Sequence, residues 1–308
     1  MKRKDFLETA VLATGSLLYA PASNLTKTSP TMDFKLTIRD ADVPNICKTC
    51  GTRFASNCMD EKHCPICLDD RQYLKEYGQQ WISYHELKQQ HTVRINKLRD
   101  DLYELTTHPS FAIGQRALFV TTPEGNILWD CIPLLDEASA AFIKQKGGLK
   151  AIVISHPHYY SLMAEWAEAF KCNVYLHKKD SNWVMDESSR YRFWNSNHIE
   201  FLPGIQVIHL GGHFPGSSVL HLTPKNKKSA LLIGDTLYLS RNKKHLSAMY
   251  SYPNVIPLSQ EELFEIFNKV NAISFDSLYG AFAWQTIHTD AKEILKNSMA
   301  TYHKAFNN

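Results

Sequence analysis

Short apolar runs alternate with amphipathic stretches along the chain from residue 111 onward. The runs "ALFVTT" and "NILWDC" are joined by the turn-rich "PEGN", which predicts two strands connected as a hairpin. The stretch "DEASAAFIKQKGGLK" predicts a helix that ends at a pair of glycines, and "AIVI" directly after it predicts a buried strand. The alternation continues to a last amphipathic stretch, "TDAKEILKNSMATYHKAF". Strands that alternate with helices predict a layered α/β domain over residues 111–308.

The segment before this domain, residues 76–110, lacks the same alternation. It is rich in polar and aromatic residues, as in "KEYGQQWISYHELKQQ", and one part of it has helical character. We therefore expect a helical connector or a lid between the domain and whatever precedes it.

Two close pairs of cysteines, "CKTC" and "CPIC", lie within residues 32–75. Two C-x2-C pairs can place four thiolates at the corners of a tetrahedron, as in a zinc ribbon. The alternative is two disulfides, but close pairs of this kind more often bind metal or do redox work. We therefore expect a small zinc-ribbon-like lobe with one structural zinc. Its ligands would be Cys47, Cys50, Cys64 and Cys67.

Residues 1–31 have the layout of an export signal. A basic head, "KRK", precedes the short apolar stretch "AVLATGSLLYA", and "APA" supplies the small residues that a signal peptidase requires. "RKDFL" also resembles the twin-arginine signal of bacteria, with Lys4 where the second arginine usually stands. We expect a signal peptide and export to the bacterial periplasm. The alternative is an uncleaved tail on a cytoplasmic protein.

Polar residues that can bind metal follow several of the apolar runs. His156 and His158 come directly after "AIVIS", His213 lies in "GGHFPGSS", and Asp235 ends "ALLIGD". Ligands gather at the ends of strands in α/β folds, so we expect these four side chains to meet. Three histidines are a ligand set of catalytic zinc, which keeps an open position for water. Asp235 would be a fourth ligand or would orient the water, and iron is an alternative metal.

The order of these motifs resembles that of the metallo-β-lactamase fold superfamily over about residues 111–305. "NILWDC" resembles the motif of its structural aspartate, here Asp130, and "SHPHYYS" resembles the His-x-His-x-Asp-His motif. "GGHFPGSS" resembles the third-histidine motif, and "GDT" resembles the bridging-aspartate motif. The resemblance implies an αββα four-layer sandwich with metal at one edge between two sheets. With its N-terminal lobe, the chain resembles an uncharacterised subgroup of this superfamily.

The chain departs from the family at the ligands of a second metal. Tyr160 and Ser161 stand where the family has Asp and His, and Gly280 is followed by Ala281 where the family often has His. The sequence therefore predicts a mononuclear site. His288 is an alternative replacement ligand, although its place at the start of the last helix favours a structural role.

A single zinc would lower the pKa of its bound water to about 7 and supply hydroxide at neutral pH. Asp235 would hold that water or act as general base, and Tyr160, or Tyr159, would donate a hydrogen bond to a developing oxyanion. These roles predict a hydrolase for a small ester, amide, thioester or phosphoester. The alternative is a catalytically degenerate member of the superfamily that serves as a metal-stabilised binding module.

Composition and charge exclude several classes of function. The formal net charge is +3, with 34 basic and 31 acidic residues, which does not indicate nucleic-acid binding. No Gly-x-Gly-x-x-Gly, P-loop or Gly-x-Ser-x-Gly motif is present, so nucleotide binding and serine hydrolysis have no support. We expect a small-molecule substrate and no transmembrane span in the mature chain, while the oligomeric state is not predicted.

Overall fold

The structure is a computed structural model of the chain, and it describes residues 36–55 and 63–307. The expected export signal at residues 1–31 lies outside the described residues. Among the helices that the structure describes, none combines the length and the apolar character needed to cross a membrane.

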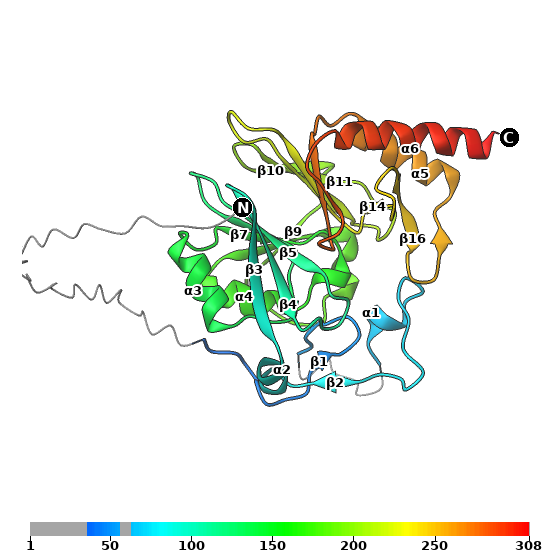
Figure 1. Cartoon of the computed structure of the whole chain (residues 1–308). Coiled ribbons are helices and arrows are strands. Elements are labelled where there is room, and N and C mark those ends of the chain that lie inside the picture. The colour runs from blue at the N-terminus through cyan, green and yellow to red at the C-terminus, as the bar shows by residue number, and fades with distance from the viewer. Residues whose placement is uncertain (1–35, 56–62, 308) are drawn as a thin grey trace, which may run out of the picture. The chain divides into compact units, whose positions relative to one another are not determined.

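Two β-sheets form the centre of the molecule (Figure 1). The seven-stranded sheet has its strands in chain order from β3 to β9, antiparallel from β3 to β6 and parallel from β6 to β9. These strands are β3 (Thr92–Arg99), β4 (Leu102–His108), β5 (Arg116–Val120), β6 (Ile127–Trp129), β7 (Ala151–Val153), β8 (Asn173–His177) and β9 (Tyr191–Trp194).

The six-stranded sheet has the order β10-β11-β12-β13-β18-β19, in which only β13 and β18 are parallel neighbours. Its strands are β10 (His198–Leu202), β11 (Ile205–His209), β12 (Ser218–Leu222), β13 (Ala230–Gly234), β18 (Ser277–Gly280) and β19 (Thr286–Ile287). Two small hairpins lie between β13 and β18, made of β14 (Tyr238–Leu239), β15 (Leu246–Ser247), β16 (Met249–Ser251) and β17 (Ile256–Pro257).

The two sheets pack face to face and helices cover their outer faces. Strand β5 shows the pattern: Phe119 belongs to the core shared with the helices, whereas Leu118 and Val120 belong to the core between the sheets. Strands buried on both faces read as continuous apolar runs, which is the pattern of "ALFV". The covering helices are α3 (Glu137–Gln145) and α4 (Met163–Phe170) on the first sheet, and α5 (Gln260–Asn271) and α6 (Ala291–Phe306) on the second. The expected αββα four-layer architecture is thus confirmed.

The segment expected to be a helical connector or lid forms two strands of the first sheet. Only α2 (Tyr84–Gln90), capped by Ser83, is helical, and β3 and β4 follow it as an antiparallel pair. Strand β3 is the edge of the sheet and no side chain in it is fully buried. An edge strand is paired along one side only and is partly exposed to solvent, so it tolerates polar residues. The sequence "TVRINKLR" therefore carries no apolar run. The sheet therefore begins at residue 92, before the expected start of the domain at residue 111.

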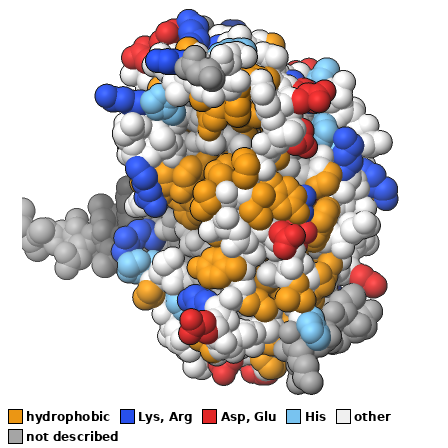
Figure 2. Space-filling view, turned by 90° about the vertical axis from the view of Figure 1, so that its right-hand side faces the viewer, with side chains coloured by type: hydrophobic (Ala, Val, Ile, Leu, Met, Phe, Trp, Pro, Cys, Tyr) orange, Lys and Arg blue, Asp and Glu red, His pale blue; other side chains and the backbone are white. Residues whose placement is uncertain are grey.

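The described cysteine-rich segment forms a small lobe, which we call the cysteine lobe (residues 45–55 and 63–82). It contains β1 (Ile46–Cys47), α1 (Pro65–Leu68) and β2 (Trp81–Ile82). Its core consists of four cysteines with Phe54 and Ile66. The face of the molecule that carries α1 and the β16–β17 hairpin shows many apolar side chains (Figure 2). Leu68, Val255 and Ile256 are exposed large apolar residues of these elements.

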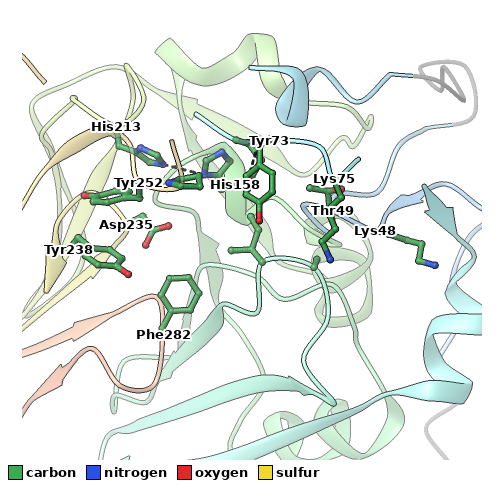
Figure 3. A pocket seen from close by; sticks show the side chains of 14 residues that line it. Lys48, Thr49, Tyr73, Lys75, His158, His213, Asp235, Tyr238, Tyr252 and Phe282 are labelled. Atoms are coloured by element: carbon green, nitrogen blue, oxygen red, sulfur yellow. Dashed lines mark hydrogen bonds between the residues drawn. The ribbon is translucent and has the colours of Figure 1, made fainter. Parts of the chain in front are cut away.

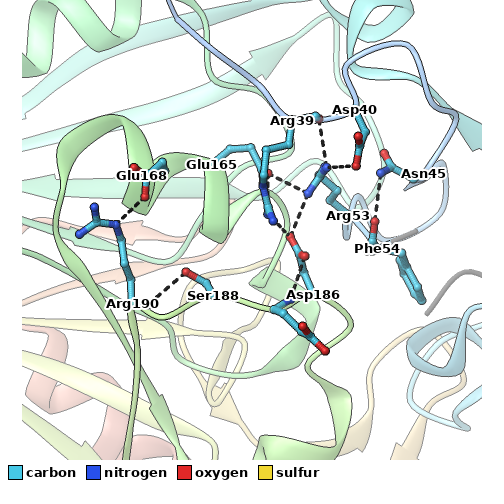
Figure 4. A network of polar contacts seen from close by, with 11 residues as sticks. Arg39, Asp40, Asn45, Arg53, Phe54, Glu165, Glu168, Asp186, Ser188 and Arg190 are labelled. Carbon is cyan, nitrogen blue, oxygen red and sulfur yellow. Dashed lines mark hydrogen bonds and ion pairs between the residues drawn. The ribbon is translucent and has the colours of Figure 1, made fainter. Parts of the chain in front are cut away.

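A buried ion network joins the cysteine lobe to helix α4 (Figure 4). Arg53 places its Nη1 atom 2.8 Å from a Glu165 carboxylate oxygen and 2.9 Å from an Asp186 oxygen. Arg39 contacts the same two carboxylates at 3.1 and 2.9 Å. Burial raises the pKa of Glu165, and Arg53 is the largest influence that lowers it. The network therefore depends on the balance of two cations against two buried carboxylates, with the half-exposed Asp40 3.6 Å from Arg53 as a third anion.

Replacement of Arg53 by methionine is expected to lower the free energy of unfolding by about 3 kcal/mol, because it leaves buried carboxylates without their main partner. Urea denaturation measures the change. The control is Arg190→Met, which breaks an ion pair with Glu168, also on α4, at 2.7 Å. Since Glu168 is 69% exposed, that change is expected to cost less than about 1 kcal/mol. Equal losses in the two variants would contradict a structural role for the buried network.

Candidate metal centre

The four residues that the sequence predicts to bind the catalytic metal meet at one edge of the sandwich. His156 follows β7 and His158 lies in the 3-10 turn η2 (Pro157–Tyr159), whereas His213 lies between β11 and β12 and Asp235 follows β13. The residues therefore come from both sheets. Each offers one ligand atom, and these atoms all lie within 4.8 Å of one another. We call this group the histidine site.

Buried polar atoms without partners mark the position where a metal ion fits. Nε2 of His156, Nε2 of His158 and Oδ1 of Asp235 are buried and form no hydrogen bond. His213 Nε2 lies 3.2 Å from His158 Nδ1. Buried polar atoms almost always have a partner, so this concentration of unpaired acceptors suits a cation. The donor set, three imidazoles and one carboxylate, suits zinc and also iron.

Neighbouring groups orient the imidazoles. His213 Nδ1 lies 2.9 Å from the carbonyl oxygen of Tyr250, and His156 Nδ1 lies 2.9 Å from the Ser155 hydroxyl. A ring nitrogen that donates to such a partner leaves the other nitrogen free to bind metal. Burial lowers the pKa of all three histidines, to about 4 for His213. The imidazoles are therefore neutral at pH 7, which is the form that binds metal.

Asp130 and Gly216 fix the loops that carry the histidines. The Asp130 carboxylate accepts a hydrogen bond from the Ser155 backbone N–H at 2.7 Å, which gives it the structural role that the resemblance implies. The Gly216 N–H donates to the Asp180 carboxylate at 2.7 Å. A Cβ atom at Gly216 would lie 2.6 Å from that carboxylate, so the close approach requires glycine.

Tyr160 does not take the catalytic position expected for it. Its hydroxyl donates to the Asp180 backbone oxygen at 3.2 Å, and it is absent from the cavity lining. The 3-10 turn through residues 157–159 turns the backbone, so consecutive tyrosines point in different directions. Tyr159 is the one that lies beside the histidine site. Burial raises the pKa of Asp235 to about 6, and the Tyr159 hydroxyl acts in the opposite direction.

The residues that replace the family's second-metal ligands take part in other contacts. Gln115 donates from Nε2 to the Ser161 hydroxyl at 3.0 Å and to the Cys131 backbone oxygen at 3.1 Å. Ala281 is buried and offers no ligand atom. His288 does not replace them, because it lines a separate hollow with Arg99, Lys228 and others. Within the described residues, the histidine site and the four cysteines are the two groups that could hold a metal.

The four-cysteine site has the dimensions of a structural zinc site. Cys47 and Cys67 have their sulfur atoms 3.6 Å apart, and Cys50 and Cys64 have theirs 3.7 Å apart. A tetrahedron with Zn–S bonds of about 2.3 Å has sulfur–sulfur edges of about 3.8 Å. All four are free cysteines in the structure, not the alternative pair of disulfides. Gln79 Nε2 also donates to Cys47 Sγ at 3.1 Å, which supports a thiolate there.

A cavity of about 340 Å³ opens beside the histidine site. Figure 3 shows Tyr238, Tyr252 and Phe282 on one side of it, near Asp235. The cysteine lobe supplies the opposite part of the lining: Lys48, Thr49, Gln72, Tyr73 and Lys75. The contribution of the lobe was not predicted, because no sequence pattern indicates contacts between segments so far apart in the chain.

No protein-family model matches the chain. The Bacillus subtilis (strain 168) protein described as uncharacterized protein YmaE is 39% identical over 265 residues, which are 85% of this chain and 96% of that protein. The solved structure of VMB-1 is 20% identical with a TM-score of 0.52, and covers 70% of this chain and 98% of that one. DIM-1 metallo-β-lactamase is 16% identical with a TM-score of 0.52, over 69% and 98% of the chains. The chain therefore has the metallo-β-lactamase fold and belongs to the same family as YmaE.

Proposed function

We propose that this protein is a metal-dependent hydrolase that uses a single zinc ion at the histidine site. The observation that carries the proposal is the meeting of four buried side chains, His156, His158, His213 and Asp235, whose ligand atoms lie within 4.8 Å of one another beside an open cavity. The metallo-β-lactamase fold and the metal-binding residue set support hydrolysis. The substitutions at residues 160, 161 and 281 support one metal ion there instead of two.

Zinc bound here would lower the pKa of a water molecule and polarise the bond to be cleaved. The chain's own residues would do the remaining work. Asp235 would accept the proton of the attacking water at the carboxylate oxygen that does not hold the metal. Tyr238 lines the cavity close to Asp235, so its hydroxyl would donate a hydrogen bond to the developing oxyanion (Figure 3).

The lining of the cavity supports a small substrate with an apolar body and a negative charge. Aromatic rings form much of its surface, and its volume suits a small molecule. Lys48 and Lys75 are the basic residues of the lining. Of the described residues that line the cavity, Asp235 alone is acidic, and it belongs to the histidine site. An anionic group of the substrate would therefore be attracted to the side formed by the cysteine lobe.

A panel of chromogenic esters, thioesters, phosphoesters and lactams tests the proposal, assayed with and without a metal chelator. We expect turnover of at least one class, its loss in chelator, and its recovery on addition of zinc. Turnover that resists complete removal of metal would contradict the mechanism. A protein that keeps its metal and binds compounds from the panel without cleaving any of them would favour the alternative, a metal-stabilised binding module.

Replacement of Lys75 by methionine is expected to lower kcat/KM about tenfold for an ester that carries a carboxylate. The matched neutral ester should change less than about twofold, because only the charged one loses an attraction. Steady-state kinetics on the ester pair measures the difference. Lys178→Met is the control, because this lysine lies over the Phe193 ring at 5.1 Å and is not part of the lining. Equal losses for both esters would show that Lys75 does not select for charge.

A further inference from the structure

Arg71 belongs to the cysteine lobe, but its side chain ends at the histidine site. It is 9% exposed, and its Nε atom donates to the backbone oxygen of His213. The guanidinium carbon lies 4.6 Å from the centre of the Phe214 ring and 4.1 Å from that of the Tyr250 ring. The Tyr250 carbonyl is the group that orients the His213 ring. Arg71 therefore contacts the backbone of His213 and the rings of Phe214 and Tyr250.

Arg71 is also attached, through Asp69, to the turn that carries the second cysteine pair, Cys64 and Cys67. Arg71 follows Cys67 by four positions, and its Nη1 atom lies 2.9 Å from both carboxylate oxygens of Asp69. The Asp69 backbone N–H donates in turn to the Pro65 oxygen, inside the knuckle between Cys64 and Cys67. The position of the guanidinium thus depends on the shape of that knuckle.

Asn254 holds the same stretch from the other side. Its Nδ2 atom donates to the backbone oxygens of Asp70 at 2.8 Å and Gln72 at 3.1 Å, which flank Arg71. Asn254 lies in the β16–β17 hairpin, whose first strand contains Tyr250. The hairpin, the knuckle and the third-histidine loop therefore form one connected unit around Arg71.

We propose that Arg71 is a positioning residue that couples the two metal sites, so that metal in the cysteine lobe strengthens metal binding at the histidine site. A lobe whose core is mostly cysteine depends on metal for its shape. Loss of that metal would release the Asp69–Arg71 turn and, with it, the backbone of His213. Coupling of this kind is reciprocal, so metal at the histidine site would also strengthen binding in the lobe. The inference rests on the proposed metal site and not on hydrolysis.

The first test measures zinc affinity at the histidine site by competition with a chromogenic chelator, with the four-cysteine site loaded throughout. We expect Arg71→Met to weaken this affinity about tenfold, and Arg71→Lys to weaken it less. Arg241→Met is the matched control, because Arg241 also lies over an aromatic ring, Trp284 at 4.2 Å, without contacting the histidine site. An Arg71→Met protein with the affinity of the Arg241→Met protein would overturn the proposal.

A double-mutant cycle tests the coupling itself. Cys50→Ser removes a ligand of the lobe, and its effect on histidine-site affinity is measured in the wild-type and Arg71→Met backgrounds. We expect Cys50→Ser to weaken the site about tenfold when Arg71 is present and less than about twofold when it is absent. Equal factors in the two backgrounds would overturn the proposal. Circular dichroism confirms that each variant is folded, and if Cys50→Ser is not, the comparison of Arg71→Met with Arg241→Met decides.

These measurements separate the coupling from the proposed activity. A protein that binds metal with the expected non-additivity but cleaves no substrate would retain the coupling and lose the hydrolase proposal. A protein that cleaves a substrate but binds metal independently at its two sites would retain the hydrolase proposal and lose the coupling. Cobalt in place of zinc adds a spectroscopic check, because thiolate charge-transfer bands report the lobe and the weaker ligand-field bands report both sites.

Discussion

Alanine in place of His156 is expected to empty the histidine site and to lower kcat/KM by about 10⁴-fold or more. The imidazole is one of three that would hold the metal, and it is fully buried, so no water-exposed side chain can take its place. Without the metal, no hydroxide forms at neutral pH. Elemental analysis should fall from about two metal ions per chain to about one, which remains in the four-cysteine site.

The matched control is His288→Ala, which removes a histidine that lines a different hollow. This variant should keep both metals and wild-type kcat/KM. A wild-type content of three metals per chain would show that a second ion finds ligands at the histidine site. Loss of one of them in His288→Ala would identify the replacement ligand. A His156→Ala protein that keeps its full activity would exclude this site as the catalytic centre.

The meeting of the four side chains of the histidine site could be predicted from the sequence because each follows a recognisable strand. His156 comes after "AIVI" and Asp235 ends "ALLIGD", and the ends of buried strands are where α/β folds gather their ligands. The spacing of the cysteine pairs likewise limits four thiolates to one small volume. The alternation of strands and helices predicted an α/β layer structure, and the resemblance carried by the motif order implied the four-layer architecture. These features depend on local patterns, and local patterns are what a sequence displays directly.

The contacts around the site could not be predicted in this way. Arg71 and His213 are 142 positions apart, and no periodicity in the chain relates them. The direction of Tyr160 depends on a single 3-10 turn, which rotates side chains that an extended backbone would place by simple alternation. The edge strand β3 has polar residues because its side chains are partly or fully exposed to solvent. Its composition therefore resembles that of a connector. In each case the outcome depends on the tertiary structure and not on the local sequence.

Serine in place of Cys50 is expected to release the metal of the cysteine lobe and to unfold the lobe locally. Four of the six buried side chains in the lobe's own core are its cysteines, so little apolar area inside the lobe remains to hold it together. Structural zinc contributes about 10–16 kcal/mol of apparent binding free energy in small domains at pH 7, and a three-ligand site would lose much of it. Limited proteolysis within residues 63–82 should become about 100-fold faster or more, since cleavage follows the population of the open form.

The control for this change is Cys172→Ser, which replaces another buried free cysteine that belongs to neither metal-ligand group. It should keep two metals and the wild-type rate of proteolysis in the lobe. The two sheets should stay folded in the Cys50→Ser variant, because their three apolar cores contain none of the lobe's cysteines. A Cys50→Ser protein that resists protease as well as the control would show that packing against the sandwich, and not metal, holds the lobe. The buried ion network of Arg53 would then be the main attachment, and Arg53→Met should expose the lobe to protease instead.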